Sequence, residues 1–124
     1  MTKILLVDDS KALHAFVQSC LLSAEVELIH AYNGKEALEK ISNAGSVDFD
    51  LVLLDWEMPI MDGPTALAQM KSSSPCLPVM MMSSRNSPED ISTMITHGAQ
   101  EFVIKPFTAD ILIQKVEQTL GKEL

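Results

Sequence analysis

The chain has 124 residues, enough for one packed core, and its hydrophobic fraction of 47% is typical of a globular protein. Its formal net charge of −8 argues against direct nucleic-acid binding. No apolar run approaches the length of a membrane span, no signal peptide is evident, and the two cysteines fit reduced thiols. We therefore expect one cytoplasmic domain over residues 1–124, without membrane insertion and without an output domain.

Five short apolar segments, taken in chain order, predict five β-strands. Short apolar runs bounded by turn signals are typical of buried strands in a parallel sheet. Four of the five end on an acid, a hydroxyl or a base. The predicted strands are residues 3–7, 26–31, 51–54, 78–82 and 101–104.

Helical patterns follow each strand. The first has an apolar stripe with helical spacing, and the second opens on Asn33 and Glu36, which resemble a capping box. The others begin near residues 63, 87 and 108. The stripe of the first helix comprises Leu13, Phe16, Val17, Cys20 and Leu21. Strict alternation predicts an α/β fold, a flavodoxin-like doubly wound (βα)5 architecture with a five-stranded parallel sheet in the order 2-1-3-4-5.

The residues at the carboxyl ends of these strands indicate the chemistry. Asp8 and Asp9 follow the first strand and Asp55 the third, and these two strands flank the switch point of the predicted sheet. Ser83 and Lys105 end the fourth and fifth. Three clustered carboxylates repel one another by about 4 kcal/mol per pair, so they need a cation, and an all-oxygen set favours Mg²⁺. An aspartate beside Mg²⁺, an ammonium and a hydroxyl is an arrangement for phosphoryl transfer.

Four separated motifs, in this order, resemble the receiver domain of two-component response regulators, and single-domain chemotaxis regulators are the most similar in style. The resemblance covers residues 3 to about 120. Its motifs are Asp8-Asp9, Asp55 with Met58-Pro-Ile-Met-Asp-Gly63, Ser83, and Lys105-Pro106-Phe107. It implies a phosphorylation-dependent switch rather than a conventional enzyme.

The resemblance also implies roles for individual residues around the acids. Asp55 would be the phosphoacceptor and would receive its phosphoryl group from a histidine kinase or a phosphotransfer protein. Asp9 and Asp55 would ligate Mg²⁺ directly, with the backbone carbonyl of Glu57, and Asp8 would act mainly through water. Lys105 would contact the phosphoryl group.

Three further roles concern the switch itself. Ser83 would bind a phosphoryl oxygen through its hydroxyl, and the switch aromatic Phe102 would then rotate inward. The Lys105–Pro106 peptide bond would be cis.

Two hypotheses come from the residues around these motifs. Glu57 and Arg85 lie two residues after the acceptor and two after the switch hydroxyl, so we expect them to pair at the mouth of the site and to tune the lifetime of the phosphorylated state. We also expect a downstream protein to bind the face formed by the fourth helix, the fifth strand and the fifth helix. That predicted output surface comprises Ile91, Phe102, Ile111 and Ile113.

Three alternatives remain beside this interpretation. A phosphatase of the haloacid-dehalogenase type also uses an aspartyl phosphate and Mg²⁺, but it needs an aspartate two residues after the nucleophile, where this chain has Glu57. A flavodoxin shares the fold, but Asp8 and Asp9 would repel the FMN phosphate. The third is a receiver module separated from a longer regulator or hybrid kinase. The three histidines, His14, His30 and His97, are scattered over three elements, and we interpret none of them as a ligand.

Overall fold

The structure, a computed structural model, describes residues 1–43 and 49–124. Its described part alternates five strands with five helices, which confirms the predicted α/β class. The strands are β1 (Thr2–Val7), β2 (Val26–Ala31), β3 (Leu51–Asp55), β4 (Val79–Ser83) and β5 (Glu101–Ile104). The helices are α1 (Lys11–Cys20), α2 (Gly34–Asn43), α3 (Gly63–Ser73), α4 (Pro88–Thr96) and α5 (Ala109–Leu120).

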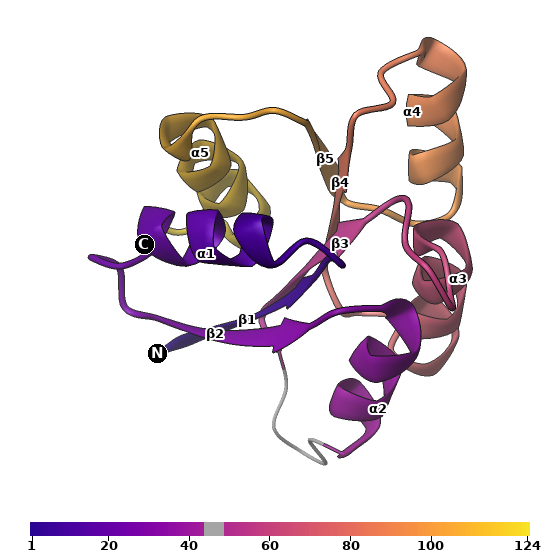
Figure 1. Cartoon of the computed structure of the whole chain (residues 1–124), viewed down its shortest axis with the longest axis horizontal. Helices are drawn as coiled ribbons and strands as arrows, with labels where there is room; N and C mark the ends of the chain where they lie inside the picture. Colours follow the sequence, from indigo (N-terminus) through magenta and orange to yellow (C-terminus); the bar gives the residue numbers. More distant parts are fainter. Residues whose placement is uncertain (44–48) are drawn as a thin grey trace.

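All strand pairs are parallel, and the sheet order is β2-β1-β3-β4-β5, as predicted. Helices α1 and α5 cover one face of the sheet, and α2, α3 and α4 cover the other (Figure 1). Each face carries its own hydrophobic core, and β3 and β4 are buried along their whole length because both cores pack on them. No helix in the described ranges is both long and apolar enough to cross a membrane.

Side-chain caps fix where the helices begin. At four helices a residue just before the first turn accepts a hydrogen bond from the backbone N–H three residues later. These caps are Ser10, Asp62, Ser87 and Thr108. Asn33 does the same for α2, where its Oδ1 accepts from the N–H of Glu36 at 2.8 Å, the Asn33 half of the predicted capping box.

The buried face of α1 differs from the predicted stripe. Phe16 is 40% exposed, whereas His14, one turn from the helix start, is only 3% exposed. The prediction failed because an apolar pattern cannot anticipate a buried polar ring whose two nitrogens both find partners. Phe16 instead lies at the surface beside Phe107, with ring centroids 5.9 Å apart.

The loop between β3 and α3 holds its backbone tightly against the end of β3. A side chain at Gly63 would collide with the backbone oxygen of Asp55, so only glycine permits this approach. Ile60 has φ 69°, and the N–H of Met61 donates to the oxygen of Pro59 at 2.7 Å, which forms a γ-turn around Ile60. A positive φ is unfavourable for a β-branched residue.

Replacing Ile60 by glycine should therefore stabilise the protein. The left-handed conformation costs about 1–2 kcal/mol for a residue with a Cβ, and glycine avoids this cost. Glycine also gives the unfolded chain more conformational freedom, which offsets part of the benefit, so we expect a net gain of about 0.5–1 kcal/mol. Little packing is lost because the Ile60 side chain is 78% exposed. Urea unfolding measures the change, and Ile60→Val, which keeps the strain, should show no gain. A less stable glycine variant would mean that the turn is not strained.

Candidate functional site

Three carboxylates meet at the switch point of the sheet, where β1 and β3 end. Asp8 is fully buried, Asp55 is 6% exposed, and Asp9 faces solvent. One oxygen of each lies within 4.8 Å of the others. The strand order thus brings together the three acids that the sequence places after two different strands.

Lys105, which follows β5, reaches across the end of β4 into this cluster. Its Nζ donates to Asp8 Oδ2 at 2.8 Å and to Asp55 Oδ1 at 2.9 Å. The next peptide bond, Lys105–Pro106, is cis. One ammonium therefore contacts two of the three carboxylates, and the cluster keeps an excess of negative charge.

The surroundings shift the pKa values of both partners. Burial raises the pKa of Asp55 to about 6, and the nearby charge of Asp8 adds to this, while the hydrogen bond from Lys105 acts in the opposite direction. Burial lowers the pKa of Lys105, but its hydrogen bonds to Asp8 and Asp55 outweigh that and raise the pKa above the usual value. Lys105 thus stays charged, and Asp55 is largely ionised at neutral pH.

A small cavity of about 170 Å³ opens beside Asp55. Its lining includes Ser83 and Lys105, which come from the ends of β4 and β5. The Oγ of Ser83, which is 3% exposed, accepts from the N–H of Arg85 at 2.9 Å, so its own hydrogen is available for another acceptor. A carboxylate, an ammonium and a hydroxyl group therefore face one space.

The cluster suits a hard divalent cation. Its donors are carboxylate oxygens, two of the three residues are buried, and the single ammonium of Lys105 leaves their charge incompletely balanced. The site therefore fits the predicted Mg²⁺. Asp8 already accepts from the N–H of Ser10 and from Lys105, which agrees with an indirect role for its carboxylate.

Glu57 and Arg85 form a pair at the mouth of the cavity. Arg85 Nε donates to Glu57 Oε1 at 2.7 Å, and Arg85 Nη1 lies 3.8 Å from Asp90 Oδ1. Both members of the Glu57–Arg85 pair are well exposed, so the ion pair contributes little to stability. The sequence prediction of a contact across the mouth is met by the geometry, and its effect on phosphoryl lifetime stays a prediction.

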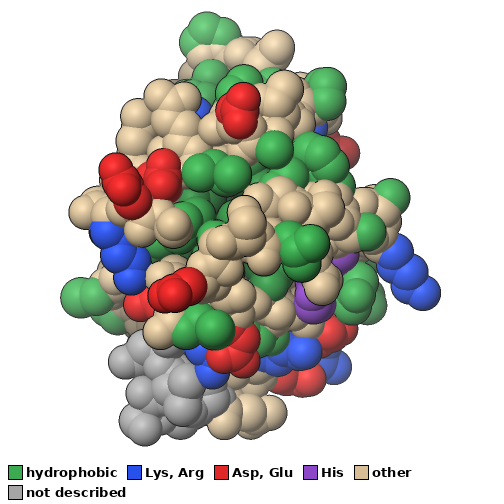
Figure 2. Space-filling view, turned by 90° about the vertical axis from the view of Figure 1, so that its left-hand side faces the viewer, with side chains coloured by type: hydrophobic (Ala, Val, Ile, Leu, Met, Phe, Trp, Pro, Cys, Tyr) green, Lys and Arg blue, Asp and Glu red, His purple; other side chains and the backbone are tan. Residues whose placement is uncertain are grey.

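An apolar groove lies next to the acidic cluster on the face of α1 and α5. We call it the α1–β5 groove; it is lined by Leu13, Phe16, Ser84, Lys105, Pro106 and Phe107. Figure 2 views the side of the molecule on which α1 and α5 lie, and it shows hydrophobic side chains exposed across the upper part of this face among scattered acidic ones. The groove was not among the sequence predictions, because its residues come from three separate segments of the chain.

The predicted output surface needs one correction. Ile113 is half-buried and packs against the core under α1 and α5, so it does not point outward as expected. Ile111 is 43% exposed and lies one helical turn before Lys115, whose Nζ is 5.1 Å from the centroid of the Phe102 ring. Ile111 therefore faces the β5 side of its helix.

Helix α4 contributes a residue that the sequence reasoning missed. Ile95 is 56% exposed, one turn after the half-buried Ile91. The spacing of four residues was the available signal. From here on the output surface denotes Ile91, Ile95, Phe102 and Ile111.

Two histidines that looked scattered lie in contact. Nδ1 of His14 is 2.7 Å from Nδ1 of His30, and Nε2 of His14 is 2.8 Å from the backbone oxygen of Asp8. No pattern in the sequence signalled this contact, because the two residues are 16 positions apart on a helix and a strand. His97 is exposed at the end of α4.

A family model, curated relatives and a solved structure all relate this chain to response regulator receivers. The family model described as response regulator receiver domain matches residues 4–117. The chain is 34% identical over 119 residues to the chemotaxis protein CheY of Listeria monocytogenes, covering 95% of this chain and 98% of that protein. It is 37% identical to part of the transcription factor SKN7 of Chaetomium thermophilum, covering 96% of this chain and 15% of SKN7. A chain in the CheX–CheY–BeF3–Mg²⁺ complex of Borrelia burgdorferi is similar with a TM-score of 0.89 and 29% identity, covering 94% of this chain and 87% of that one.

The raised pKa of Asp55 predicts that Asp55→Asn stabilises the metal-free protein. Unfolded Asp55 ionises at its usual pKa near 3.8 and folded Asp55 at about 6, so folding becomes less favourable as the pH rises through this window. The asparagine variant lacks that penalty. In EDTA above pH 6 we expect it to be more stable by about 1–3 kcal/mol, with the gain vanishing near pH 4.

Urea unfolding over a pH series measures this gain. Asp62→Asn is the matched control, because the hydrogen bond from Thr65 lowers the pKa of Asp62 and the pH dependence should have the opposite sign. An Asp55→Asn gain that is equal at every pH would contradict the electrostatic explanation.

Proposed function

The chain belongs to the response regulator receiver family, and we propose that it is a cytoplasmic, phosphorylation-dependent signalling switch with Asp55 as its phosphoacceptor. The observation that carries this proposal is the contact of Lys105 Nζ with Asp55 Oδ1 at 2.9 Å, beside a cavity that also exposes Ser83. The protein would assist its own phosphorylation and dephosphorylation and would not convert a separate substrate.

The phosphoryl donor would be a histidine kinase or a phosphotransfer protein. An oxygen of ionised Asp55 attacks the phosphorus, the N–P bond of the donor phosphohistidine breaks, and the imidazole leaves with the electron pair. Lys105 then has a phosphoryl oxygen as a new partner, and the hydroxyl of Ser83 donates to another. The α1–β5 groove shares Ser84 and Lys105 with the cavity, which supports it as the surface on which the donor docks.

Mg²⁺ is the cofactor that this site would hold. Asp9 and Asp55 would be direct ligands with the backbone carbonyl of Glu57, and Asp8 would take part through water. When bound, the ion would offset the negative charge that gathers between the carboxylates and the incoming phosphoryl group. The oxygen-only donor set and its unbalanced charge support this assignment.

Output would pass from Ser83 to Phe102 and on to a downstream protein. Phe102 on β5 pairs with Met81 on β4, and Met81 lies two residues before Ser83. The side chains of Phe102 and Ser83 therefore lie on the same face of the sheet. The ring of Phe102 is half-buried and packs at the margin of a core, which leaves it room to change position. The exposed isoleucines of the output surface support an apolar protein partner rather than nucleic acid.

The enzyme alternative is less well supported. The position that a haloacid-dehalogenase-type phosphatase would use for its general acid holds Glu57, whose carboxylate is occupied by Arg85 at the mouth. A receiver within a longer regulator stays open as the second candidate, because the chain is similar both to a protein of its own length and to a part of a much longer one.

Phosphorylation of Asp55 is directly testable. Acetyl phosphate with Mg²⁺ should add one phosphoryl group, detected by intact mass, and EDTA should suppress the addition. Asp55→Asn should remain unmodified, and Lys105→Arg, which keeps the charge but changes the donor geometry, should react more slowly. The same adduct on Asp55→Asn would place the acceptor elsewhere. Asp50→Asn is a control of the same type just before β3, at the opposite end of the strand from Asp55, and it should be labelled normally.

The Glu57–Arg85 pair should slow hydrolysis of the phosphorylated form. Removing either side chain opens the path of the attacking water at the mouth, so Glu57→Ala and Arg85→Ala should both lose the phosphoryl group faster, by about twofold to tenfold. The measurement is dephosphorylation of purified phosphoprotein by intact mass. Both substitutions break the same Glu57–Arg85 contact. The double variant should therefore lose the phosphoryl group no faster than the quicker of the two single variants. Unchanged dephosphorylation rates would mean that Glu57 and Arg85 act as two independent solvated charges with no effect on hydrolysis.

The corrected output surface predicts a difference between two neighbouring isoleucines. Ile111→Glu should leave phosphorylation of Asp55 intact and abolish capture of the downstream protein by the BeF₃⁻-loaded form, because it places a charge in an apolar contact. Ile111→Val is the conservative control and should retain capture. Ile113→Glu should instead lower thermal stability, because Ile113 packs against a core. Retained capture by Ile111→Glu would place the output surface on another face.

A further inference from the structure

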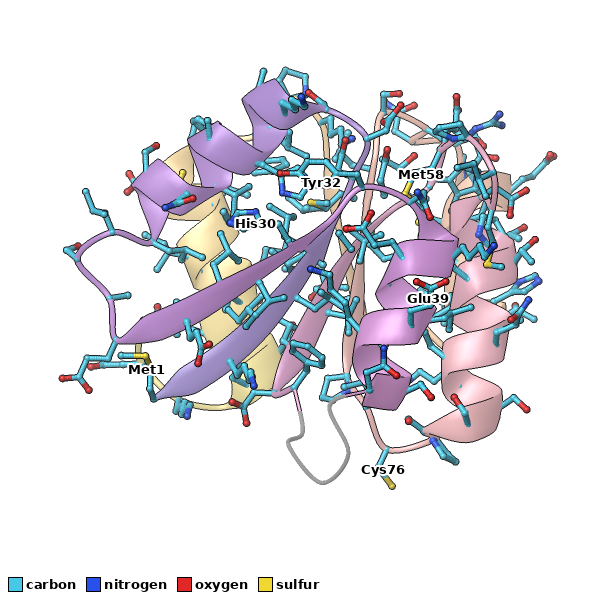
Figure 3. All side chains as sticks on the ribbon, turned by 60° about the horizontal axis from the view of Figure 1, so that its bottom comes forward. Met1, His30, Tyr32, Glu39, Met58 and Cys76 are labelled. Carbon is cyan, nitrogen blue, oxygen red and sulfur yellow. The ribbon has the colours of Figure 1, made fainter. Side chains whose placement is uncertain are left out.

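Behind the acidic cluster, hydrogen bonds connect β2 through α1 to the peptide unit that joins Asp8 and Asp9. The His14 ring at the centre of this chain is 3% exposed, with Nε2 2.8 Å from the backbone oxygen of Asp8 and Nδ1 2.7 Å from Nδ1 of His30. The ring of Tyr32 stacks on it at a centroid distance of 4.3 Å. Figure 3 shows His30 and Tyr32 near one another, between β2 and the helix above it.

The chemistry of the groups fixes where the hydrogens lie. A carbonyl oxygen only accepts, so Nε2 of His14 must carry a hydrogen. Nδ1 of a neutral ring is then bare and accepts, which makes Nδ1 of His30 the donor. Burial lowers the pKa of His30, and the charge of Lys40 acts in the same direction, which favours the neutral ring that this order requires.

The carbonyl of Asp8 has reason to need this partner. Asp8 is fully buried just beyond the last residue of β1, where the strand ladder has ended. Its other polar groups are already engaged: its N–H donates to Ala31, Oδ1 accepts from the N–H of Ser10, and Oδ2 accepts from Lys105. A buried carbonyl without a partner is unfavourable, and His14 removes that penalty.

We propose that His14 is a positioning residue for the metal site, with His30 holding it in the donating tautomer. The peptide unit between Asp8 and Asp9 is planar, so a hydrogen bond to its oxygen fixes the plane from which both acidic residues extend. The inference rests on the proposed function, because it takes this cluster to bind Mg²⁺. Loss of a partner behind the ligands of a metal typically weakens binding by about 10–100-fold.

Three substitutions of His14 separate positioning from packing. In His14→Gln the amide nitrogen replaces Nε2 and can still donate to Asp8. In His14→Asn the side chain keeps an acceptor near His30 but is too short to reach the carbonyl, and His14→Leu fills space without any polar atom. His97→Leu, on the exposed end of α4, is the control for removing an imidazole. Mg²⁺ affinity is measured at one fixed pH from the fluorescence of Trp56, which adjoins Asp55, and the free energy of unfolding is measured in EDTA.

We expect His14→Leu and His14→Asn to weaken Mg²⁺ binding by about tenfold or more, and His14→Gln to remain within about threefold of the original protein. Long-range ¹⁵N spectra of the unmodified protein should show hydrogen on Nε2 of His14 and on Nδ1 of His30. If His14→Leu does not fold, His14→Asn against His14→Gln makes the same comparison.

Several outcomes would overturn the inference. Equal Mg²⁺ affinity in the Gln, Asn and Leu variants, with lowered stability in all three, would reduce His14 to a packing residue. A bare Nε2 on His14 would remove the hydrogen bond itself. Absence of Mg²⁺ binding by the unmodified protein would overturn the proposed metal site together with this inference, whereas binding that is insensitive to His14 would overturn the inference alone.

Discussion

The ammonium of Lys105 connects the end of β5 to the ends of β1 and β3, neither of which is a neighbour of β5 in the sheet. It follows β5, extends past the end of β4, and donates to Asp8 after β1 and to Asp55 at the end of β3. Backbone ladders position the strands, and within residues 1–43 and 49–124 Lys105 is the side chain that opposes the repulsion between the acids that the topology brings together. One positive charge does not balance three carboxylates, so the site keeps an excess of negative charge that would suit a further cation.

The same constraint makes the site costly for the fold. Burial raises the pKa of Asp55, so an ionised, reactive carboxylate is maintained against the preference of the protein interior. The neighbouring loop adds local strain at Ile60 and leaves no room for a side chain at Gly63. These features are concentrated at one end of the sheet, whereas β3 and β4 are buried between two apolar cores. The stability supplied by those cores permits an unfavourable site at the strand ends.

The sequence was most informative where one physical rule governs many residues. Alternating strands and helices determine a parallel sheet, and a parallel sheet puts Asp8, Asp55, Ser83 and Lys105 at the same edge. The rule for helix faces was weaker. Helix α5 contacts α1 as well as the sheet, so its buried face is wider than the stripe of Leu112 and Val116 and includes part of Ile113.

His14 escaped prediction for a different reason. A polar residue on a helix is normally assigned to the surface, and its burial is tolerable here only because Asp8 supplies an acceptor and His30 a donor. Neither partner can be inferred from periodicity, since one is a backbone atom and the other lies on β2. Contacts of this kind depend on the completed fold.

The arrangement of the two surfaces has a consequence for signalling. The α1–β5 groove contacts the site through Lys105, on the face of the sheet covered by α1 and α5. The proposed output surface lies on the β5 edge, α4 and α5, and its proposed connection to the site runs through Ser83 and Phe102. A donor in the groove and a target on the output surface would thus occupy different faces. Coupling between two binding events is reciprocal. If phosphorylation raises the affinity for the target by some factor, target binding must favour phosphorylation by the same factor, because both favour the same state of Ser83 and Phe102. Target binding and phosphorylation are in that case two ways of biasing one equilibrium, whose position depends on how firmly Lys105 and Ser83 hold the group on Asp55.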